Sequence, residues 1–269
     1  MLTGMEEEQK MEQKKDRLLP ISIIAAALLI GGSVVFSTFY RGGAPAPAGP
    51  AVATSTAQGN TGPSAADVAA AMQLTPRDVV LGNADAPVTV IEYGDYQCPF
   101  CTQFFLKAQP LIVTNYVNAG KAKLVFRDFP FLDRFPGLPS TANESHDAGA
   151  AAECAKDQGK FWDFHNALYS AKAADEAKGG GENDGLYSKS LFVNIANQLG
   201  MNISTFTSCI VSGKYADTVN NDYKTAQAAG INSTPTTFVN GVKVVDAGGN
   251  SVGANTDAIA AAIDAALKK

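Results

Sequence analysis

Two cysteines separated by two residues could carry redox chemistry. Cys98 and Cys101 follow a strand-like run, residues 88–93, and lie at the start of a helix-like run, residues 100–117. The first sulfur therefore lies at a helix N-terminus, where unpaired N–H groups and the helix dipole favour a thiolate. Pro99 suits the first helical turn because its missing N–H is not needed there. The second sulfur, one turn along, can form a disulfide with the first, so the pair predicts dithiol–disulfide exchange.

The alternative is that this pair forms half of a metal site or two inert core thiols. A zinc site needs about four ligands, and the sequence has neither a second C-x-x-C pair nor an H-x-x-x-H pair. We therefore favour redox chemistry at Cys98 and Cys101, and we expect no metal and no cofactor. His146 and His165 fall in helix-like runs, and we assign neither a catalytic nor a metal-binding role.

The composition fits one folded domain with appendages. The chain has 269 residues, 17% of them charged, and a formal net charge of −5, which gives no sign of nucleic-acid binding. Four cysteines are too few for a small protein built on disulfides. They suit one redox pair together with either a second bridge or two spare thiols.

The N-terminal part of the chain is typical of a membrane anchor. Residues 1–17 are charged and include four basic residues, and residues 18–40 form an apolar run without a charged residue. As a helix with a rise of about 1.5 Å per residue, this run spans about 34 Å, enough to cross a bilayer. Only Arg41 follows the run closely, so the bias of basic residues predicts a cytoplasmic tail, one transmembrane helix and an exported remainder.

A cleaved signal peptide is the competing interpretation. The apolar run is long for a signal peptide, and residues 37–40 do not form a small-residue cleavage site, although the alanines among residues 44–48 offer one further along. We favour the uncleaved anchor, and hence a single-pass protein of the cell membrane with its main domain outside the cytoplasm. Residues 41–75 are predicted to be a flexible linker rich in Gly, Ala, Pro and Ser, with a short helix near residues 67–73.

The elements that must position the cysteines follow an α/β pattern. The sequence predicts strands at residues 79–81, 88–93 and 123–126. The helix of residues 100–117 separates the last two strands, and Pro110 should kink it. Strand, helix and strand in this order make a right-handed parallel unit.

A helical segment follows this unit. From about residue 138 to residue 230 there is no strand signal, and glycines separate helix-like runs, with a glycine-rich flexible loop at residues 178–185. Residues 236–239 and 242–245 flank an Asn-Gly turn, which is a strong hairpin signal. Residues 256–267 predict a closing amphipathic helix. The pattern therefore indicates a helical domain inserted into an α/β domain.

Four short motifs are spaced along the predicted domain. They are GNADAPV at residues 82–88, DYQCPFC at 95–101, GKFW at 159–162, and STPT at 233–236 followed by Asn240-Gly241. Together they resemble the membrane-anchored DsbA-like thiol–disulfide oxidoreductases of bacteria, which belong to the thioredoxin superfamily. The resemblance covers about residues 76–269 and implies a thioredoxin fold with an inserted helical domain.

The resemblance implies roles for the matching residues. Cys98 would be the exposed nucleophile and Cys101 the more buried resolving thiol of a redox-active disulfide. Thr234 and Pro235 would form an active-site loop with a cis peptide bond, beside which an extended substrate can pair. Glu92 would be a buried acid that takes the proton of the resolving thiol; the alternative is an acid at a solvated strand end.

Phe100 departs from the family pattern. The best-known DsbA has a histidine at this position between the cysteines, where a histidinium helps to hold the thiolate. Phe100 removes this source of stabilisation, so the sequence leaves the reduction potential of the pair open.

The remaining two cysteines lie on separate predicted helices of the insertion. In an exported domain two unpaired thiols would be a liability, so we expect Cys154 and Cys209 to form a structural disulfide rather than two buried thiols. Because the bridge would close a long loop, the chain-entropy model gives it about 4 kcal/mol of stabilisation.

These residues predict an exported, membrane-tethered enzyme that oxidises cysteine pairs of substrate proteins through a Cys98–Cys101 disulfide. The resemblance implies that a quinone-linked membrane protein reoxidises the pair, with residues 18–40 holding the two partners close. Two alternatives stay open, namely a disulfide reductase or isomerase of the same fold and a non-catalytic metal-binding module.

Overall fold

The computed structural model describes residues 62–135 and 143–269, which belong to one compact unit. The predicted cytoplasmic tail of residues 1–17 and the predicted transmembrane helix of residues 18–40 lie outside the described residues, as does most of the predicted linker. Within the described ranges, no helix combines the length and the apolar character needed to cross a membrane.

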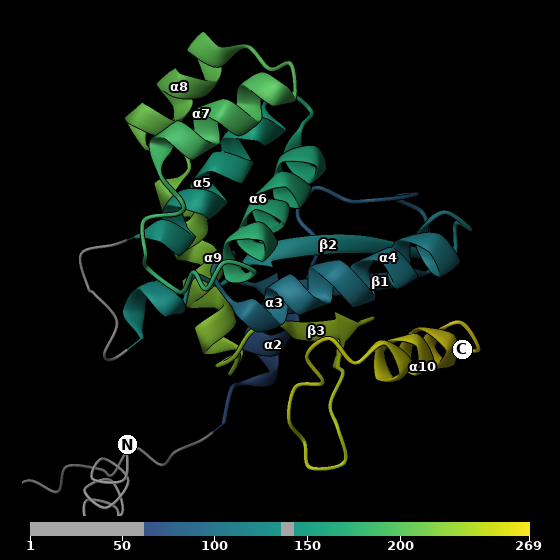
Figure 1. Cartoon of the computed structure of the whole chain (residues 1–269). Helices are drawn as coiled ribbons and strands as arrows, with labels where there is room; N and C mark the ends of the chain where they lie inside the picture. Colours follow the sequence, from purple (N-terminus) through teal and green to yellow (C-terminus); the bar gives the residue numbers. More distant parts are fainter. Residues whose placement is uncertain (1–61, 136–142) are drawn as a thin grey trace, which may run out of the picture. The chain divides into compact units, whose positions relative to one another are not determined.

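The chain alternates between strand and helix around the cysteine pair and then becomes helical (Figure 1). In chain order the elements are α2 (Ala65–Met72), β1 (Val88–Gly94), α3 (Pro99–Gln103), η1 (Phe104–Ala108), α4 (Gln109–Ile112), η2 (Val113–Val117), β2 (Ala122–Asp128), η3 (Leu132–Arg134), α5 (Glu144–Lys156), α6 (Phe161–Glu176), α7 (Lys189–Gln198), α8 (Ile203–Ser212), α9 (Ala216–Ala228), β3 (Thr236–Val239), β4 (Val242–Lys243) and α10 (Thr256–Ala266). The elements η1 and η2 are π-helical turns, and η3 is a 3₁₀ turn.

The described strands form one sheet in the order β2-β1-β3-β4. β1 runs parallel to β2 and antiparallel to β3, and β3 pairs with β4 as an antiparallel hairpin. The β1–helix–β2 crossover and the C-terminal hairpin are therefore the two units that the sequence predicts. In this register Glu92 of β1 lies between Phe126 of β2 and Thr237 of β3.

The predicted strand of residues 79–81 is one of two that the structure shortens. Only Leu81 pairs, through an isolated bridge to Leu124. The carbonyl oxygen of Val79 instead accepts a hydrogen bond from Trp162 Nε1 of α6, at 3.1 Å. A side chain of the insertion thus takes the place of a neighbouring strand.

The second shortened strand is the one predicted at residues 242–245. β4 covers only Val242–Lys243. The Val244 N–H still donates to the Thr237 carbonyl at 2.9 Å. Val245 then pairs with Ser251 in an isolated bridge, so the chain leaves the sheet after Val244 and makes its own turn before α10.

The helix that follows Cys98 is continuous from α3 to η2 but is not uniformly α-helical. The sequence predicts a kink at Pro110, and the structure places this residue in α4, between the π-helical turns η1 and η2. Proline has no N–H to donate to the preceding turn, and a π-turn is one way in which a helix accommodates such an interruption.

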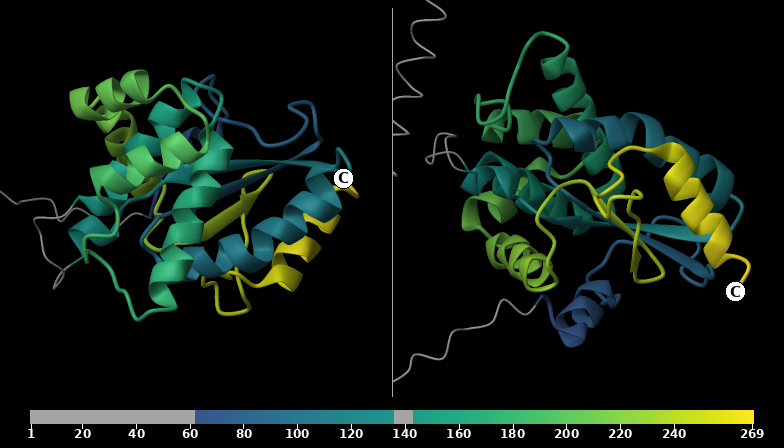
Figure 2. Two further views of the ribbon diagram at one scale, coloured as in Figure 1. Left: turned by 45° about the horizontal axis from the view of Figure 1, so that its top comes forward. Right: turned by 90° about the horizontal axis from the view of Figure 1, so that it is seen from below.

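Helices cover both faces of the sheet (Figure 2). On one face the long helix after Cys98 and α10 bury an apolar cluster with Val88 and Val90 of β1. On the other face α2 and α9 pack against Ile91. Because side chains alternate along a strand, Glu92 shares the face of Val88 and Val90, which is the face covered by the long helix after Cys98 and by α10.

α2 extends the folded part of the chain into the predicted linker of residues 41–75. Ala71 of this helix is fully buried, and its carbonyl oxygen accepts hydrogen bonds from Tyr93 Oη, at 2.6 Å, and from Arg127 Nη1. Arg127 also forms a buried ion pair with Asp78 at 2.8 Å. These contacts correct the expected start of the domain near residue 75, because α2 is already part of its core.

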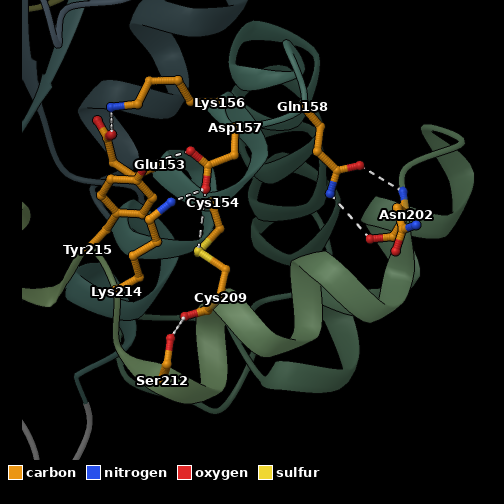
Figure 3. Close-up of a disulfide and its surroundings, with 10 residues drawn as sticks. All are labelled: Glu153, Cys154, Lys156, Asp157, Gln158, Asn202, Cys209, Ser212, Lys214 and Tyr215. Carbon is orange, nitrogen blue, oxygen red and sulfur yellow. Dashed lines mark hydrogen bonds and ion pairs between the residues drawn. A yellow bond between two sulfur atoms is a disulfide. The ribbon is translucent and has the colours of Figure 1, made fainter.

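The helical segment predicted from residue 138 to residue 230 divides into two parts. α5, α6, α7 and α8 stack beyond one end of the sheet, whereas α9 returns to cover a face of it (Figure 1). Cys154 of α5 forms a disulfide with Cys209 of α8, with Cα atoms 5.9 Å apart (Figure 3). This is the pairing that the sequence predicts. Gln158 and Asn202 join the same two helices by two further hydrogen bonds, of 2.7 and 3.2 Å.

Candidate active site

Cys98 is the N-cap residue of α3, and Pro99 follows it in the first helical turn. Its backbone is extended (φ −72°, ψ 121°), and no side chain caps this end of the helix. The N–H groups of the first turn are therefore available to an anion at the Cys98 sulfur. In the thiol form shown here, Cys98 Sγ–H donates to the carbonyl oxygen of Thr234 at 3.5 Å.

The two thiols of the pair have opposite electrostatic surroundings. A hydrogen bond from the Cys101 thiol, aided by the Thr234 side chain and by backbone N–H groups, lowers the pKa of Cys98 to about 7 against the opposing effect of burial. Burial raises the pKa of Cys101 well above its usual value. Near neutral pH, Cys98 can therefore ionise while Cys101 remains a thiol.

Cys98 is less accessible than the resemblance implies. The expected exposed nucleophile is 3% exposed, compared with 0% for Cys101. The reason is that the loop of Thr234 and Pro235 lies against the Cys98 sulfur. Phe100, in contrast, is 61% exposed. Phe100 is therefore the exposed residue of the motif, whereas the Cys98 sulfur is largely covered.

The loop before β3 is fixed from both sides. Thr234–Pro235 is a cis peptide bond, as the resemblance implies. The Ser251 hydroxyl donates to the Pro235 carbonyl at 2.6 Å, and the Thr236 hydroxyl donates to the Ser233 carbonyl at 2.7 Å. The hydroxyl of Thr234 is buried and has no hydrogen-bond partner among the described residues within normal distance, so it is available to a thiolate at Cys98.

Glu92 lies in the sheet beneath the cysteine pair. It is 2% exposed, and its Oε1 has no hydrogen-bond partner among the residues that the structure describes. Burial, with a smaller contribution from the Cys98 charge, raises the pKa of Glu92 well above its usual value. The charge of Glu92 in turn contributes to the raised pKa of Cys101. The alternative of a solvated strand-end acid is therefore wrong, and Glu92 is a buried acid whose charge and those of the cysteine pair act on one another.

A polar network behind Cys98 has no counterpart in the sequence predictions. The carboxyl group of Asp95, 1% exposed, accepts hydrogen bonds from the Ser145 hydroxyl at 2.6 Å and from the backbone N–H groups of Gln97 and Leu132, at 2.9 and 3.0 Å. The only signal in the sequence is that Asp95 belongs to the DYQCPFC motif. Its partner Ser145 lies on α5 and carries no motif of its own.

Gln97 extends this network to the loop predicted at residues 178–185. Its Nε2 lies 2.9 Å from Ser145 Oγ, 3.0 Å from Asn183 Oδ1 and 3.2 Å from Asp133 Oδ1, and its Oε1 accepts the Asn183 N–H. The loop that the sequence predicts to be flexible is thus held to the active-site turn at Asn183.

Both histidines have structural partners. His165 is fully buried between the hydroxyl of Tyr96, at 3.0 Å, and the side chain of Gln109, at 3.2 Å, and burial lowers its pKa to about 3. His146 contacts the carbonyl oxygen of Ala216 at 3.1 Å. Within residues 62–135 and 143–269, no cluster of three or more His, Cys, Asp or Glu side chains is arranged to hold a metal ion.

Known proteins that are similar to this chain include proteins named for disulfide bond formation. The chain is similar to a probable disulfide bond formation protein D of Bacillus anthracis, with 28% identity over 191 residues, 70% of this chain and 78% of that protein. Its structure resembles the crystal structure of oxidised BdbD from Bacillus subtilis, with a TM-score of 0.58 and 27% identity over 72% of this chain and 94% of the other.

A second group of relatives is much longer than the matched region. The Na⁺/H⁺ antiporter NhaA 3 of Salinispora tropica is 30% identical over 165 residues, which are 61% of this chain but only 22% of the antiporter. The chain therefore spans about a fifth of that relative. The family model described as thioredoxin matches residues 74–265. The chain thus belongs to the thioredoxin family, and it is a thiol–disulfide oxidoreductase with a DsbA-like helical insertion.

Proposed function

We propose that this protein is an exported, membrane-tethered oxidase of substrate dithiols that acts through a Cys98–Cys101 disulfide. The observation that carries the proposal is the asymmetry of the two thiols, since the pKa of Cys98 is lowered to about 7 while that of Cys101 is raised. A stabilised Cys98 thiolate leaves a mixed disulfide readily, and it favours the reduced enzyme, which makes the disulfide form a stronger oxidant.

Oxidation begins with the Cys98–Cys101 disulfide. A substrate thiolate attacks the Cys98 sulfur, the bond between the two enzyme sulfurs breaks, and Cys101 leaves with the electron pair. Burial raises the pKa of Glu92 well above its usual value, so its carboxyl group can give Cys101 a proton. The second substrate thiolate then attacks the substrate sulfur of the mixed disulfide and expels the Cys98 thiolate. The substrate has lost two electrons, and the enzyme has gained them.

The substrate approaches along the loop of Thr234 and Pro235. This loop lies against the Cys98 sulfur, so an extended segment that pairs beside it brings its own sulfur into line with the enzyme disulfide. Phe100 is 61% exposed next to the sulfur and offers an apolar contact to such a segment. The substrates are therefore exported proteins with cysteine pairs in extended or unfolded segments.

Reoxidation requires a partner that accepts two electrons from the reduced pair. We propose a quinone-linked protein of the cell membrane, and residues 18–40 would hold the enzyme beside it as a single-pass anchor with a cytoplasmic N-terminus. The support for this location is the charge-free apolar run with basic residues before it. Tethering raises the effective concentration of each partner for the other.

The test is oxidation of a reduced peptide with two cysteines by the full-length protein. Because Cys98 receives the substrate sulfur, Cys98→Ser should abolish the reaction. When Cys101→Ser is given the disulfide-bonded form of the peptide instead, its Cys98 thiolate should attack that disulfide and form a mixed disulfide, releasing one peptide thiolate. Peptide oxidation that survives in Cys98→Ser would reject the proposal.

Disulfide reduction or isomerisation is the second candidate function. The observation that favours it is Phe100, which supplies no positive charge to hold the thiolate at Cys98. Equilibration with glutathione decides between the two directions. A disulfide that glutathione reduces easily supports the oxidase, and one as stable as that of thioredoxin supports the reductase.

A further inference from the structure

The buried carboxyl group of Asp95 accepts hydrogen bonds but forms no ion pair with a described cation. Its three donors are the Ser145 hydroxyl and the N–H groups of Gln97 and Leu132. No ion pair among the described residues includes it. Neutral donors stabilise the carboxylate but do not cancel its charge, and that charge acts over a longer range in a buried site than in water.

The backbone ties Asp95 directly to Cys98. The Cys98 N–H donates to the Asp95 carbonyl at 3.0 Å, which closes a turn of four residues, and the Tyr169 hydroxyl donates to the same carbonyl at 3.2 Å. The Asp95 carboxyl group accepts the N–H of Gln97 within this turn. The Asp95 carboxyl group therefore stays close to the Cys98 sulfur as long as the turn is intact.

We propose that Asp95 is a positioning residue that tunes the redox pair, with its buried carboxylate opposing formation of the Cys98 thiolate while its hydrogen bonds hold the turn. This inference rests on the proposed function, and it names a residue that affects the driving force of disulfide exchange by the Cys98–Cys101 pair. Like charges in a shared buried site disfavour each other's ionisation. The neutral form of Asp95 thus favours the Cys98 thiolate, and the ionised form favours the thiol.

Among the described residues around this turn, no cation offsets the repulsion between the Asp95 carboxylate and a Cys98 thiolate. The titratable groups that the surrounding elements contribute are Glu92, Cys101, Asp128, Asp133, Tyr169 and Tyr187, all of which are acids. α5 contributes the neutral Ser145, and the buried Lys172 of α6 pairs with Asp175. Burial raises the pKa of Asp95 to about 7, and the Cys98 charge makes a smaller contribution in the same direction.

The test is Asp95→Asn in the full-length protein. The amide can keep two of the three hydrogen bonds, because an oxygen in the place of Oδ1 accepts from both the Gln97 N–H and the Ser145 hydroxyl. Only the bond from the Leu132 N–H, which is made to Oδ2, is lost. We expect the pKa of Cys98, followed by thiolate absorbance, to fall by about one unit. The equilibrium with glutathione at pH 7 should shift about three- to tenfold toward the reduced enzyme. An unchanged or raised pKa of Cys98 would overturn the inference.

Asp133→Asn is the matched control. Asp133 bonds to Gln97, Ser145 and His146 in the same network, but its backbone does not form the turn to Cys98. The pKa of Cys98 should stay within about two tenths of a unit in this variant. An equal shift in both variants would mean that the effect comes from a disturbed network, and the role of Asp95 would be rejected.

Ser145→Ala provides a second test in case Asp95→Asn does not fold. Loss of the donor at 2.6 Å destabilises the Asp95 carboxylate, so Asp95 stays protonated to higher pH and the pKa of Cys98 should fall by a smaller amount. A rise in the pKa of Cys98 would contradict the inference. If the unmodified protein exchanged no disulfide with glutathione, the proposed function itself would fail. Normal exchange without these shifts would remove only the role of Asp95.

Discussion

Cys98 lies at the N-terminal end of α3, whereas Cys154 and Cys209 lie in the last turns of α5 and α8. The helix dipole stabilises an anion at the first position and destabilises one at the other two. The same atom type is therefore poised to become a thiolate in one pair and discouraged from doing so in the other. The position of a cysteine along its helix separates exchange chemistry from structural bonding.

Neighbouring charges reinforce this difference. Asp157 lies 4.0 Å from Cys209 Sγ, and its carboxylate is held by Lys214 at 2.7 Å and by the Tyr215 hydroxyl at 2.6 Å (Figure 3). A thiolate at Cys209 would face this carboxylate. The two disulfides also close loops of very different length. The Cys154–Cys209 bridge spans 55 residues and restricts the unfolded chain far more than a bridge between neighbouring turns can.

The largest expected effect comes from removal of the reactive cysteine of the redox pair. Cys98→Ser should reduce peptide oxidation by more than about a thousandfold, because no other sulfur in the described site lies at a helix N-terminus. The thermal midpoint of the reduced protein should change little. A paired measurement of turnover and thermal unfolding checks this, and loss of both together would contradict the separation of roles.

Removal of the structural bridge should have the converse effect. The double variant Cys154→Ala with Cys209→Ala should lose about 2–5 kcal/mol of unfolding free energy, because the bridge closes a long loop. Urea unfolding under oxidising conditions measures the loss. Exchange of the remaining pair with a peptide dithiol should keep its rate at low temperature, and a large fall in that rate would show that the two pairs are coupled.

Glu92→Gln sharpens the comparison within the redox site. The amide cannot transfer a proton to or from Cys101, so attack of Cys101 on a mixed disulfide, the reverse of the step that opens the enzyme disulfide, should slow by about 10- to 100-fold. Stopped-flow measurement of that step in the purified protein is the check. The pKa of Cys98 serves as the internal control, because the charges of Glu92 and Cys98 disfavour each other, so loss of the Glu92 carboxyl group should not raise that pKa. A slow step together with a raised pKa of Cys98 would point to a misfolded site instead.

The smallest expected effect is a dependence of stability on pH. The folded-state pKa of Cys98 is about 7, below the ordinary thiol value of 9.0. A lowered pKa stabilises the folded reduced protein fully above pH 9, and this stabilisation is lost as the pH falls through about 7. The difference in stability between the reduced protein and Cys98→Ser should therefore grow from pH 7 to pH 9. A constant difference would show that the thiolate is not specifically stabilised.

The parts of the fold that could be predicted from the sequence have local signals. The cysteine pair at a strand-to-helix junction, the Asn-Gly hairpin and the strand-free insertion each lie within one short window. The thioredoxin fold and its helical insertion are confirmed. The bridge between Cys154 and Cys209 could be predicted because only two cysteines remained once the redox pair was set aside.

The missed features depend on contacts between distant segments. The hydrogen bond from Trp162 to Val79 replaces a predicted strand, and the bond from Ser145 to Asp95 organises the active-site turn. Neither pairing leaves a periodic pattern in the sequence, because each depends on how the insertion packs against the sheet. The burial of Cys98 was missed for the same reason, since the covering loop lies more than a hundred residues further along the chain.

The hydrogen bonds between Gln97 and Asn183 have a consequence for redesign of this enzyme. Residues 178–185 belong to the insertion, yet Asn183 contacts the turn that presents the reactive sulfur. Lengthening or shortening this segment would transmit strain to the sulfur without altering any residue between the two cysteines. The length of this loop is therefore a variable through which the geometry of the reactive turn can be altered while the C-x-x-C motif is kept.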